Sequence, residues 1–317
     1  MSESYTNYFA EIYDDVMKQV PYKFWFKYLT DILIFYKCNP ESIIELAAGT
    51  GNMTTKLINI PSVGKIKALD LSDAMINKAA EKFEIIMNFS KTGKKFDYQR
   101  ENNNFKLKKS DEDKDIKLDF VQADMRDYYF EGNYDLVLSF FDSLNYLITK
   151  KDLAACFKKT AEVLKNNGLF IFDMNSIERI NTIEEKKLVL EGEEYSCFWE
   201  DIVEKDNDLW KVRLQICPDN DKDPCYEEMH IERGYTIETI KDLLYKSGFK
   251  SVDVYRAFSL DKGSNKSDRL YFIASLNQNR LNKNKGIFAK MYYSFKNDIQ
   301  YLFYSFKYSF FPPKNSN

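Results

Sequence analysis

The chain has 317 residues, enough for one large domain or one domain with an inserted segment, and its 44% hydrophobic content supports a real core. The formal net charge of −3 gives no indication of a nucleic-acid partner. No basic-then-apolar segment opens the sequence and no apolar run approaches the ~20 residues that span a bilayer, so we expect neither a secretory signal nor a membrane anchor.

The first predicted elements surround a glycine-rich turn. An aromatic-rich helix over 22–37 ends at Asn39-Pro40, and the apolar run 42–44 then leads into Glu-Leu-Ala-Ala-Gly-Thr-Gly at 45–51. Asp70 ends a second apolar run, 19 residues past Gly51. This order of strand, turn, helix, strand and acid is typical of one half of a nucleotide-binding site. We expect a helix from about Asn52 to direct its free N–H groups at an anion, and Asp70 to accept two hydrogen bonds from a ribose diol.

The next segments continue the alternation of helices and strands. Apolar residues recur at helical spacing over 73–89. Residues 88–117 are rich in Lys, Asn and Asp, so we predict a flexible surface insertion there. A third strand, 118–121, precedes Asp124, which could contact an adenine amino group. Strands at 134–139, 169–173, 250–256 and 269–276 and helices at 152–164 and 236–246 predict an α/β fold with a mostly parallel sheet and helices on both faces.

A different pattern occupies about 187–235. Three runs, 194–203, 209–216 and 226–235, are separated by Asn207-Asp208 and by 218–224, which predicts an antiparallel β meander. Because this segment follows the fifth strand, near the carboxyl edge where such sheets bind ligands, we interpret it as a lid or a wall of a substrate pocket.

The first motif, the two later acids and the strand order resemble the class I S-adenosylmethionine-dependent methyltransferases over about residues 5–276. Their acid-x-Gly-x-Gly-x-Gly motif is matched at Glu45, Gly49 and Gly51, while Ala47 stands where the family usually has glycine. The resemblance implies a Rossmann-like sheet with an antiparallel last strand and S-adenosylmethionine as cofactor. It implies cofactor contacts from Glu45, Ala47, Gly49, Gly51, Asn52, Asp70, Leu71, Met75, Ala123, Asp124, Met125 and Ser139.

The N-terminal pattern Tyr-x-x-Phe-Ala-x-x-Tyr-Asp, from Tyr5-Thr6 to Asp14, extends this resemblance to small-molecule N-methyltransferases of the sugar-amine and glycine-methylating type. In such enzymes this segment folds over the methyl donor, which implies that Tyr8 and Trp25 lie near it. For Trp25, packing in the core is the equal alternative.

Methyl transfer from a sulfonium is an in-line displacement that needs a deprotonated nucleophile. Candidate catalytic residues are therefore His230, the single histidine, and Tyr8, with Tyr13 and Asp173 as further candidate bases. Candidate substrate-binding residues follow the fourth and fifth strands or lie in the first and lid segments: Tyr13, Asn145, Tyr146, Asp173, Asn175 and Arg233. Helix capping is the alternative for the segment after the fourth strand.

No metal site is expected. Cys197, Cys217, Cys225 and His230 share one segment, but the short Cys pair of a zinc site is missing. The odd count of five cysteines, without closely spaced pairs, favours a reducing cytoplasm.

The tail combines seven basic residues over 280–314 with aromatic residues at helical spacing. We predict a basic amphipathic helix that packs on the protein, mediates a homodimer or contacts an anionic membrane surface. The expected organisation is a cofactor-binding core over 1–186, a β lid over 187–235, the completion of the core over 236–276 and the tail over 277–317.

The sequence thus predicts a methyltransferase that acts on nitrogen or oxygen of a small-molecule acceptor, without a nucleic-acid partner. A NAD-dependent oxidoreductase is one alternative, against which Thr54, in place of a third small residue, and Asp124 count. A non-catalytic S-adenosylmethionine-binding adaptor that acts through its tail is the other.

Overall fold

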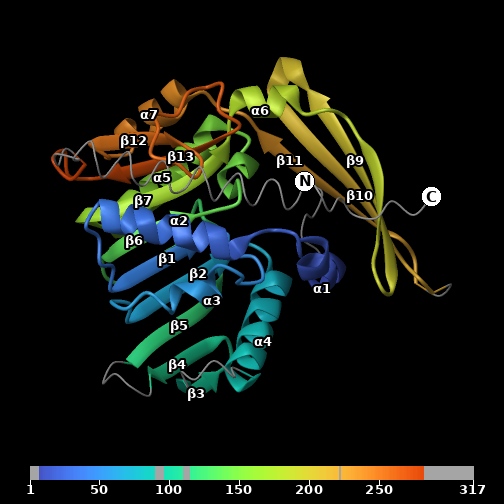
Figure 1. The fold of residues 1–317 in the computed structure, drawn as a ribbon, viewed down its shortest axis with the longest axis horizontal. Helices are drawn as coiled ribbons and strands as arrows, with labels where there is room; N and C mark the ends of the chain where they lie inside the picture. Colours follow the sequence, from blue (N-terminus) through green and yellow to red (C-terminus); the bar gives the residue numbers. More distant parts are fainter. Residues whose placement is uncertain (1–6, 90–95, 110–114, 221–222, 282–317) are drawn as a thin grey trace.

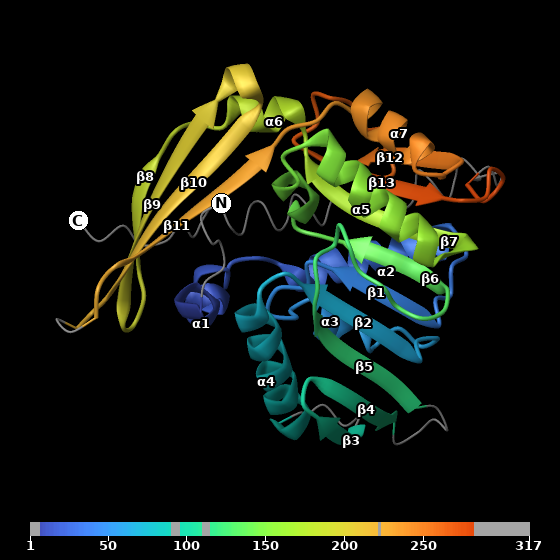
Figure 2. The same ribbon diagram turned by 180° about the vertical axis from the view of Figure 1, so that it is seen from behind.

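The computed structural model describes residues 7–89, 96–109, 115–220 and 223–281, which form a large mixed sheet with helices on both faces and a separate small sheet (Figures 1 and 2). The large sheet has the strand order β12-β13-β7-β6-β1-β2-β5-β4-β3. Its strands are β1 (Ser42–Leu46), β2 (Lys65–Asp70), β3 (Phe96–Glu101), β4 (Asn104–Lys109), β5 (Asp115–Gln122), β6 (Tyr134–Ser139), β7 (Leu164–Asn175), β12 (Ser251–Arg256) and β13 (Arg269–Ser275).

The helices cover this sheet in two groups. Helices α2, α3 and α4 contribute to the core on one face, and α5 and α7 to the core on the other. The helices are α1 (Asn7–Val16), α2 (Tyr22–Phe35), α3 (Thr54–Leu57), α4 (Asp73–Phe89), α5 (Lys150–Val163), α6 (Ile177–Thr182) and α7 (Ile237–Lys246), with 3₁₀ turns η1 (Ser143–Tyr146) and η2 (Lys205–Asn207).

The central five strands, β5, β2, β1, β6 and β7, pair in parallel, and β13 runs antiparallel to β7 and to β12. The two-sided core explains why these strands read as nearly continuous apolar runs: Ile43, Ile44 and Leu46 of β1 have no exposed surface. The predicted α/β class with an antiparallel last strand is confirmed. The helix after the glycine turn, expected from about Asn52, starts at Thr54 and has only four residues.

The prediction of a flexible insertion over 88–117 is wrong for residues 96–109. Strands β3 and β4 pair with each other and extend the sheet antiparallel to β5. Phe105 and Leu107 are buried, and the Phe105 ring lies 5.0 Å from that of Phe83 on α4. The alternation of these apolar residues with lysines has the period of a strand, and the high charge of the segment obscures it.

The small sheet contains β8 (Lys187–Glu191), β9 (Tyr195–Glu204), β10 (Leu209–Pro218) and β11 (Tyr226–Arg233) in the order β11-β10-β9-β8. The predicted antiparallel meander is confirmed, with β8 as an additional strand. One face packs on α1, where Phe9, Ala10 and Ile12 meet Val212, Leu214 and Ile216. Figures 1 and 2 both show β11 as the strand nearest the large sheet.

A disulfide between Cys217 and Cys225 closes the β10–β11 hairpin, a pairing that the spacing of the cysteines did not predict. Two of the four side chains considered for zinc are therefore bonded to each other. Within the described residues, no group of three or more His, Cys, Asp or Glu side chains is arranged to hold a metal ion, and no helix is long and apolar enough to cross a membrane. Most of the predicted tail lies outside the described residues.

We predict that Phe105→Ala lowers the free energy of unfolding by about 3–5 kcal/mol, because it removes a buried aromatic ring between α4 and the sheet. Chemical denaturation measures this change. Lys108→Ala, on the exposed side of the same strand, is the control and should change stability by less than about 0.5 kcal/mol. Equal stability of both variants and the unmodified protein would show that 96–109 contributes nothing to the core.

Candidate functional site

A cavity of about 900 Å³ opens at the carboxyl ends of β1, β2 and β6, beneath α1 and beside the edge strand β11. Such an edge is where open α/β sheets bind ligands. The cavity has two differently lined halves. The glycine turn and the segments after β2 and β5 line one half, and the other half is built from α1, the start of α2, the segment after β6 and β11.

The turn after β1 adopts left-handed backbone conformations that define the first half. Ala47, Gly49 and Gly51 have φ of 52°, 55° and 73°. A Cβ at Gly51 would lie 3.1 Å from Phe120 and 3.2 Å from Ala79, so glycine is required there, whereas a Cβ at Gly49 would meet nothing within 4 Å. Ala47 tolerates the conformation at a cost of roughly 1–2 kcal/mol. The backbone at Gly49 thus faces open space.

Two carboxyl groups lie at this turn, Glu45 buried and Asp70 partly buried. Asp70 accepts hydrogen bonds from the amides of Gly49 (2.8 Å) and Ser72 (2.9 Å), which ties the end of β2 to the turn. Glu45 accepts one from the Thr54 hydroxyl at 2.6 Å. Burial raises the pKa of Asp70 and raises the pKa of Glu45 to about 8, even though the hydrogen bond from Thr54 opposes the rise. Glu45 is therefore a protonated acid at neutral pH.

Lys82 fastens α1 over the turn. Its ammonium donates to Asp14 (2.7 Å) on α1 and to Thr50 and Asn52 (2.9 Å each) on the turn. The Thr50 hydroxyl and the Asn52 amide both donate to the other Asp14 oxygen, at 2.7 and 2.8 Å. Because each polar group here is partly withdrawn from water, the cluster fixes α1 as a roof over the turn.

The remaining wall of the first half follows β2 and β5 and includes Leu71, Ala123, Asp124 and Met125. Asp124 accepts hydrogen bonds from Arg126 at 2.6–3.0 Å, and these bonds keep its pKa below its ordinary value. Arg126 also donates to Asp152 at 3.0 Å. Asp124 is thus held in place as an ionised acceptor beside an apolar surface.

The second half is aromatic. Five tyrosines contribute to the wall, and apolar residues fill the gaps between them: Tyr8, Tyr13, Tyr22, Tyr146 and Tyr226, with Phe140, Phe141, Met229 and Ile231. Tyr8 stacks on Tyr226 at a ring separation of 4.5 Å, which joins α1 to the lid. Among the described residues that line the cavity, Arg126 is the single lysine or arginine, and it belongs to the first half.

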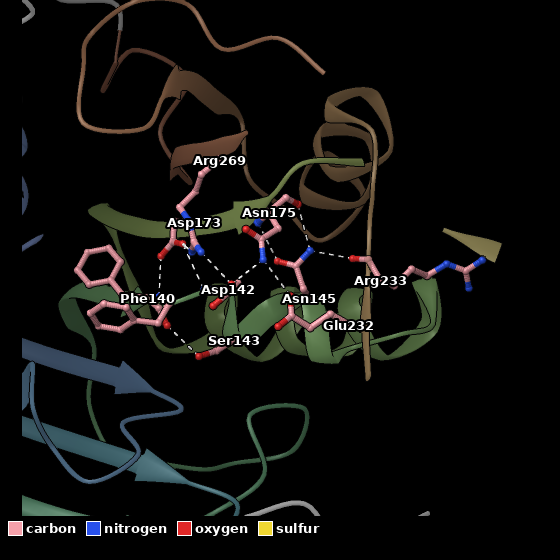
Figure 3. A network of polar contacts seen from close by, with 10 residues as sticks. Phe140, Asp142, Ser143, Asn145, Asp173, Asn175, Glu232, Arg233 and Arg269 are labelled. Atoms are coloured by element: carbon pink, nitrogen blue, oxygen red, sulfur yellow. Dashed lines mark hydrogen bonds and ion pairs between the residues drawn. The ribbon is translucent and has the colours of Figure 1, made fainter. Parts of the chain in front are cut away.

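Four predicted substrate-binding residues, Asn145, Asp173, Asn175 and Arg233, lie behind this wall instead of on it, in the polar cluster of Figure 3. Asp173 accepts the amides of Phe141 (2.8 Å) and Asp142 (3.2 Å), and Arg269 bridges Asp142 (2.8 Å) and Asp173. Burial raises the pKa of Asp173 to about 6.

The cluster positions the turn after β6. Phe141 and Asp142 have φ of 61° and 54°, a conformation that bulky side chains adopt only when surrounding contacts enforce it. The amide of Asn145 links β7 and β11 by donating to the carbonyls of Asn175 (3.1 Å) and Arg233 (2.8 Å). These side chains hold Phe140 and Phe141 against the cavity.

Other predicted residues divide in the same way. Most of them line the cavity together with the wall residues already named: Tyr8, Tyr13, Tyr146, Glu45, Ala47, Gly49, Asn52 and Asp70. The predicted residues that do not line it are Trp25, Gly51, Met75, Ser139 and His230. Trp25 packs on Phe141 (4.3 Å) and Phe258 (5.0 Å) in the core, and His230 lies behind Tyr146. Four further wall residues could not be recognised from the sequence: Tyr22, Phe140, Phe141 and Tyr226. Only the aromatic richness of their segments hinted at them.

Known proteins resemble this chain over most of its length. The model of the ubiE/COQ5 methyltransferase family matches residues 3–128, and that of a methyltransferase domain matches residues 95–168. YqeM of Bacillus subtilis (strain 168), whose name assigns it provisionally to the methyltransferases, is 28% identical over 84% of this chain and 95% of its own.

Solved structures agree. An S-adenosylmethionine-dependent methyltransferase from Clostridium acetobutylicum is 25% identical, with a TM-score of 0.66 over 86% of this chain and 98% of its own. The sugar N-methyltransferase KedS8 from Streptoalloteichus has the same fold, with 15% identity and a TM-score of 0.61 over 87% of this chain and 94% of its own. Sheet order, glycine turn, acids and comparisons lead to one assignment: the chain belongs to the class I S-adenosylmethionine-dependent methyltransferase family.

Proposed function

We propose that this protein transfers the methyl group of S-adenosylmethionine to an amine nitrogen of a small molecule with an apolar body. The observation that carries the proposal is the division of the cavity: a half with acids and a glycine turn adjoins a half walled by tyrosines. S-adenosylmethionine supplies a methyl group that its sulfonium sulfur already activates. The protein's task is to align the amine with that methyl group and to exclude water.

The first half has the groups that the donor requires. Asp70 would accept the ribose hydroxyls, and Leu71 and Met125 offer apolar contact to an adenine ring. Asp124 would accept from the adenine amino group. The open space beside Gly49 would let a ligand approach the backbone of the turn, and an ammonium group bound near Glu45 would favour the ionised form of this acid.

The second half favours an uncharged or cationic acceptor. Tyrosine rings attract cations through their faces, and their hydroxyls offer hydrogen bonds to an amine. A phosphate or carboxylate on the acceptor would find no lysine or arginine among the described residues of this half. The fold shared with a sugar N-methyltransferase supports nitrogen over oxygen as the attacking atom.

Transfer of a tritiated methyl group tests the proposal. The full chain is incubated with labelled S-adenosylmethionine and matched acceptors: an arylalkyl amine, the corresponding alcohol and the corresponding phosphorylated amine. We expect label in the amine alone. Label in the alcohol would move the reaction to oxygen, and label in the phosphorylated amine would contradict the neutral or cationic acceptor.

Asp70→Ala is expected to weaken binding of S-adenosylhomocysteine by at least about 100-fold, because it removes two hydrogen bonds from the ribose to a partly buried carboxylate, each worth about 1.5–3 kcal/mol. Isothermal titration calorimetry measures the change. Asp242→Ala, on the exposed surface of α7, is the control. Unchanged affinity in Asp70→Ala would place the ribose elsewhere.

Binding of the donor is expected to release up to one proton per protein at pH 6.5. Below pH 8 Glu45 is protonated in the free protein, and the donor's ammonium group favours its ionised form. Calorimetry in buffers of different ionisation enthalpy counts the protons. Glu45→Gln should abolish the release; a release that persists in this variant would have to come from another group.

Glu45 should also make the stability of the donor-free protein depend on pH. Its native pKa of about 8 exceeds the ordinary value of 4.5, so the unfolded chain loses this proton first and stability falls as pH rises from about 4.5 to 8. Glu45→Gln, which cannot ionise, should gain stability over the unmodified protein by on the order of 2–4 kcal/mol between pH 5 and pH 8. Chemical denaturation of both proteins at the two pH values measures this difference. The same difference in unfolding free energy at pH 5 and at pH 8 would contradict a raised pKa of Glu45.

A further inference from the structure

Strand β11 carries three buried ionisable side chains on one face, Glu228, His230 and Glu232, and the first two form a pair. Glu228 and His230 have 2% and 6% of their surface exposed, and they pair across the sheet with Leu214 and Val212. On the α1 side, the Phe9 ring lies 5.4 Å from the imidazole. Burial of such a pair costs more free energy than an apolar pair of similar volume would, so its presence calls for a reason other than stability.

The pair is connected to the cavity. The hydroxyl of Tyr146 lies 3.4 Å from His230 Nδ1, and His230 Nε2 lies 3.1 Å from Glu228 Oε2. Tyr146 lines the aromatic half of the cavity, whereas neither His230 nor Glu228 reaches it. Tyr146, His230 and Glu228 therefore form a chain of contacts, which runs from the cavity wall into the lid.

We propose that Tyr146, His230 and Glu228 form a proton relay that deprotonates the acceptor amine, an inference that rests on the proposed function. An amine that arrives as an ammonium ion has no lone pair for attack, and the roof and lid limit access of water as a base. Tyr146 meets the ammonium group, and His230 and Glu228 act through Tyr146.

The ammonium N–H bond breaks and its proton goes to the Tyr146 oxygen, while the tyrosine's own proton goes to His230 Nδ1. The amine keeps the electron pair with which it then attacks. His230 becomes an imidazolium, and the Glu228 carboxylate at Nε2 stabilises that charge. The relay requires that the neutral imidazole carries its proton on Nε2 and leaves Nδ1 as an acceptor.

The single histidine of the chain makes this requirement measurable without an acceptor. The full chain, with ¹⁵N-labelled histidine and bound S-adenosylhomocysteine, should show an unprotonated Nδ1 and a protonated Nε2 by NMR. Tyr146→Phe should shift the Nδ1 resonance toward that of a nitrogen without a hydrogen bond. Asp201→Asn, on β9 of the same lid, is the control and should leave both resonances in place.

A proton on Nδ1, or a Nδ1 resonance that Tyr146→Phe does not move, would overturn the relay even if S-adenosylhomocysteine binds. Failure of S-adenosylhomocysteine to bind would instead overturn the proposed function, so the two failures are distinguishable. The NMR experiment therefore decides between them before any acceptor is known.

Turnover separates a proton relay from a structural contact. With the arylalkyl amine of the labelling experiment, His230→Gln should lower kcat about 10- to 100-fold and change the acceptor KM and the donor Kd by less than about twofold. An arylamine of similar shape, which is already neutral at pH 7, should lose much less rate in the same variant. Equal losses with both amines, or a loss confined to KM, would assign His230 a structural role.

Discussion

The hydrogen bond from the Gly49 amide to the Asp70 carboxylate is the interaction on which the site depends. It joins the turn after β1 to the end of β2 and holds a left-handed backbone that exposes the turn to the cavity. We propose that the same carboxylate receives the donor's ribose, so that one partly buried acid would both shape the turn and recognise the ligand. Its raised pKa reflects the cost of keeping that acid away from water.

Two further polar clusters extend this constraint to the rest of the cavity. Lys82 fastens α1 to the glycine turn through Asp14. Arg269 and Asp173 hold the turn after β6 in a conformation that places Phe140 and Phe141 on the wall. Both clusters lie outside the aromatic surface that would contact an acceptor. The residues that form the wall are thus distinct from those that keep it in place. Loss of a wall residue should remove a contact to the acceptor, whereas loss of a cluster residue should shift the wall.

The residues of the first half of the cavity, which we propose binds the donor, could be predicted to lie together because they are close in the chain and their spacing follows from the geometry of strand, turn and strand. The helices and strands of the core were predicted from periodicity for the same local reason. Residues 96–109 were not, because their charge is high and only two buried apolar residues, Phe105 and Leu107, mark β4.

The second half of the cavity, which we propose contacts the acceptor, was harder to predict. Tyr8, Phe141 and Tyr226 come from three distant segments, and they converge only because α1 and the lid dock on the core. Asn145 follows β6, and Asp173 and Asn175 lie at the end of β7, at the edge of the sheet where contact with an acceptor is predicted. Their burial and their bonds to backbone groups, which the sequence does not reveal, turn them away from the cavity.

Parallel calorimetric titration of the full chain with S-adenosylhomocysteine and NADH tests the central claim most directly. The cavity predicts micromolar binding of S-adenosylhomocysteine and no binding of NADH, because Thr54 stands where the turn of a dinucleotide site has its third small residue. Binding of NADH alone would contradict the assignment of the donor half and, with it, the proposed methyl transfer.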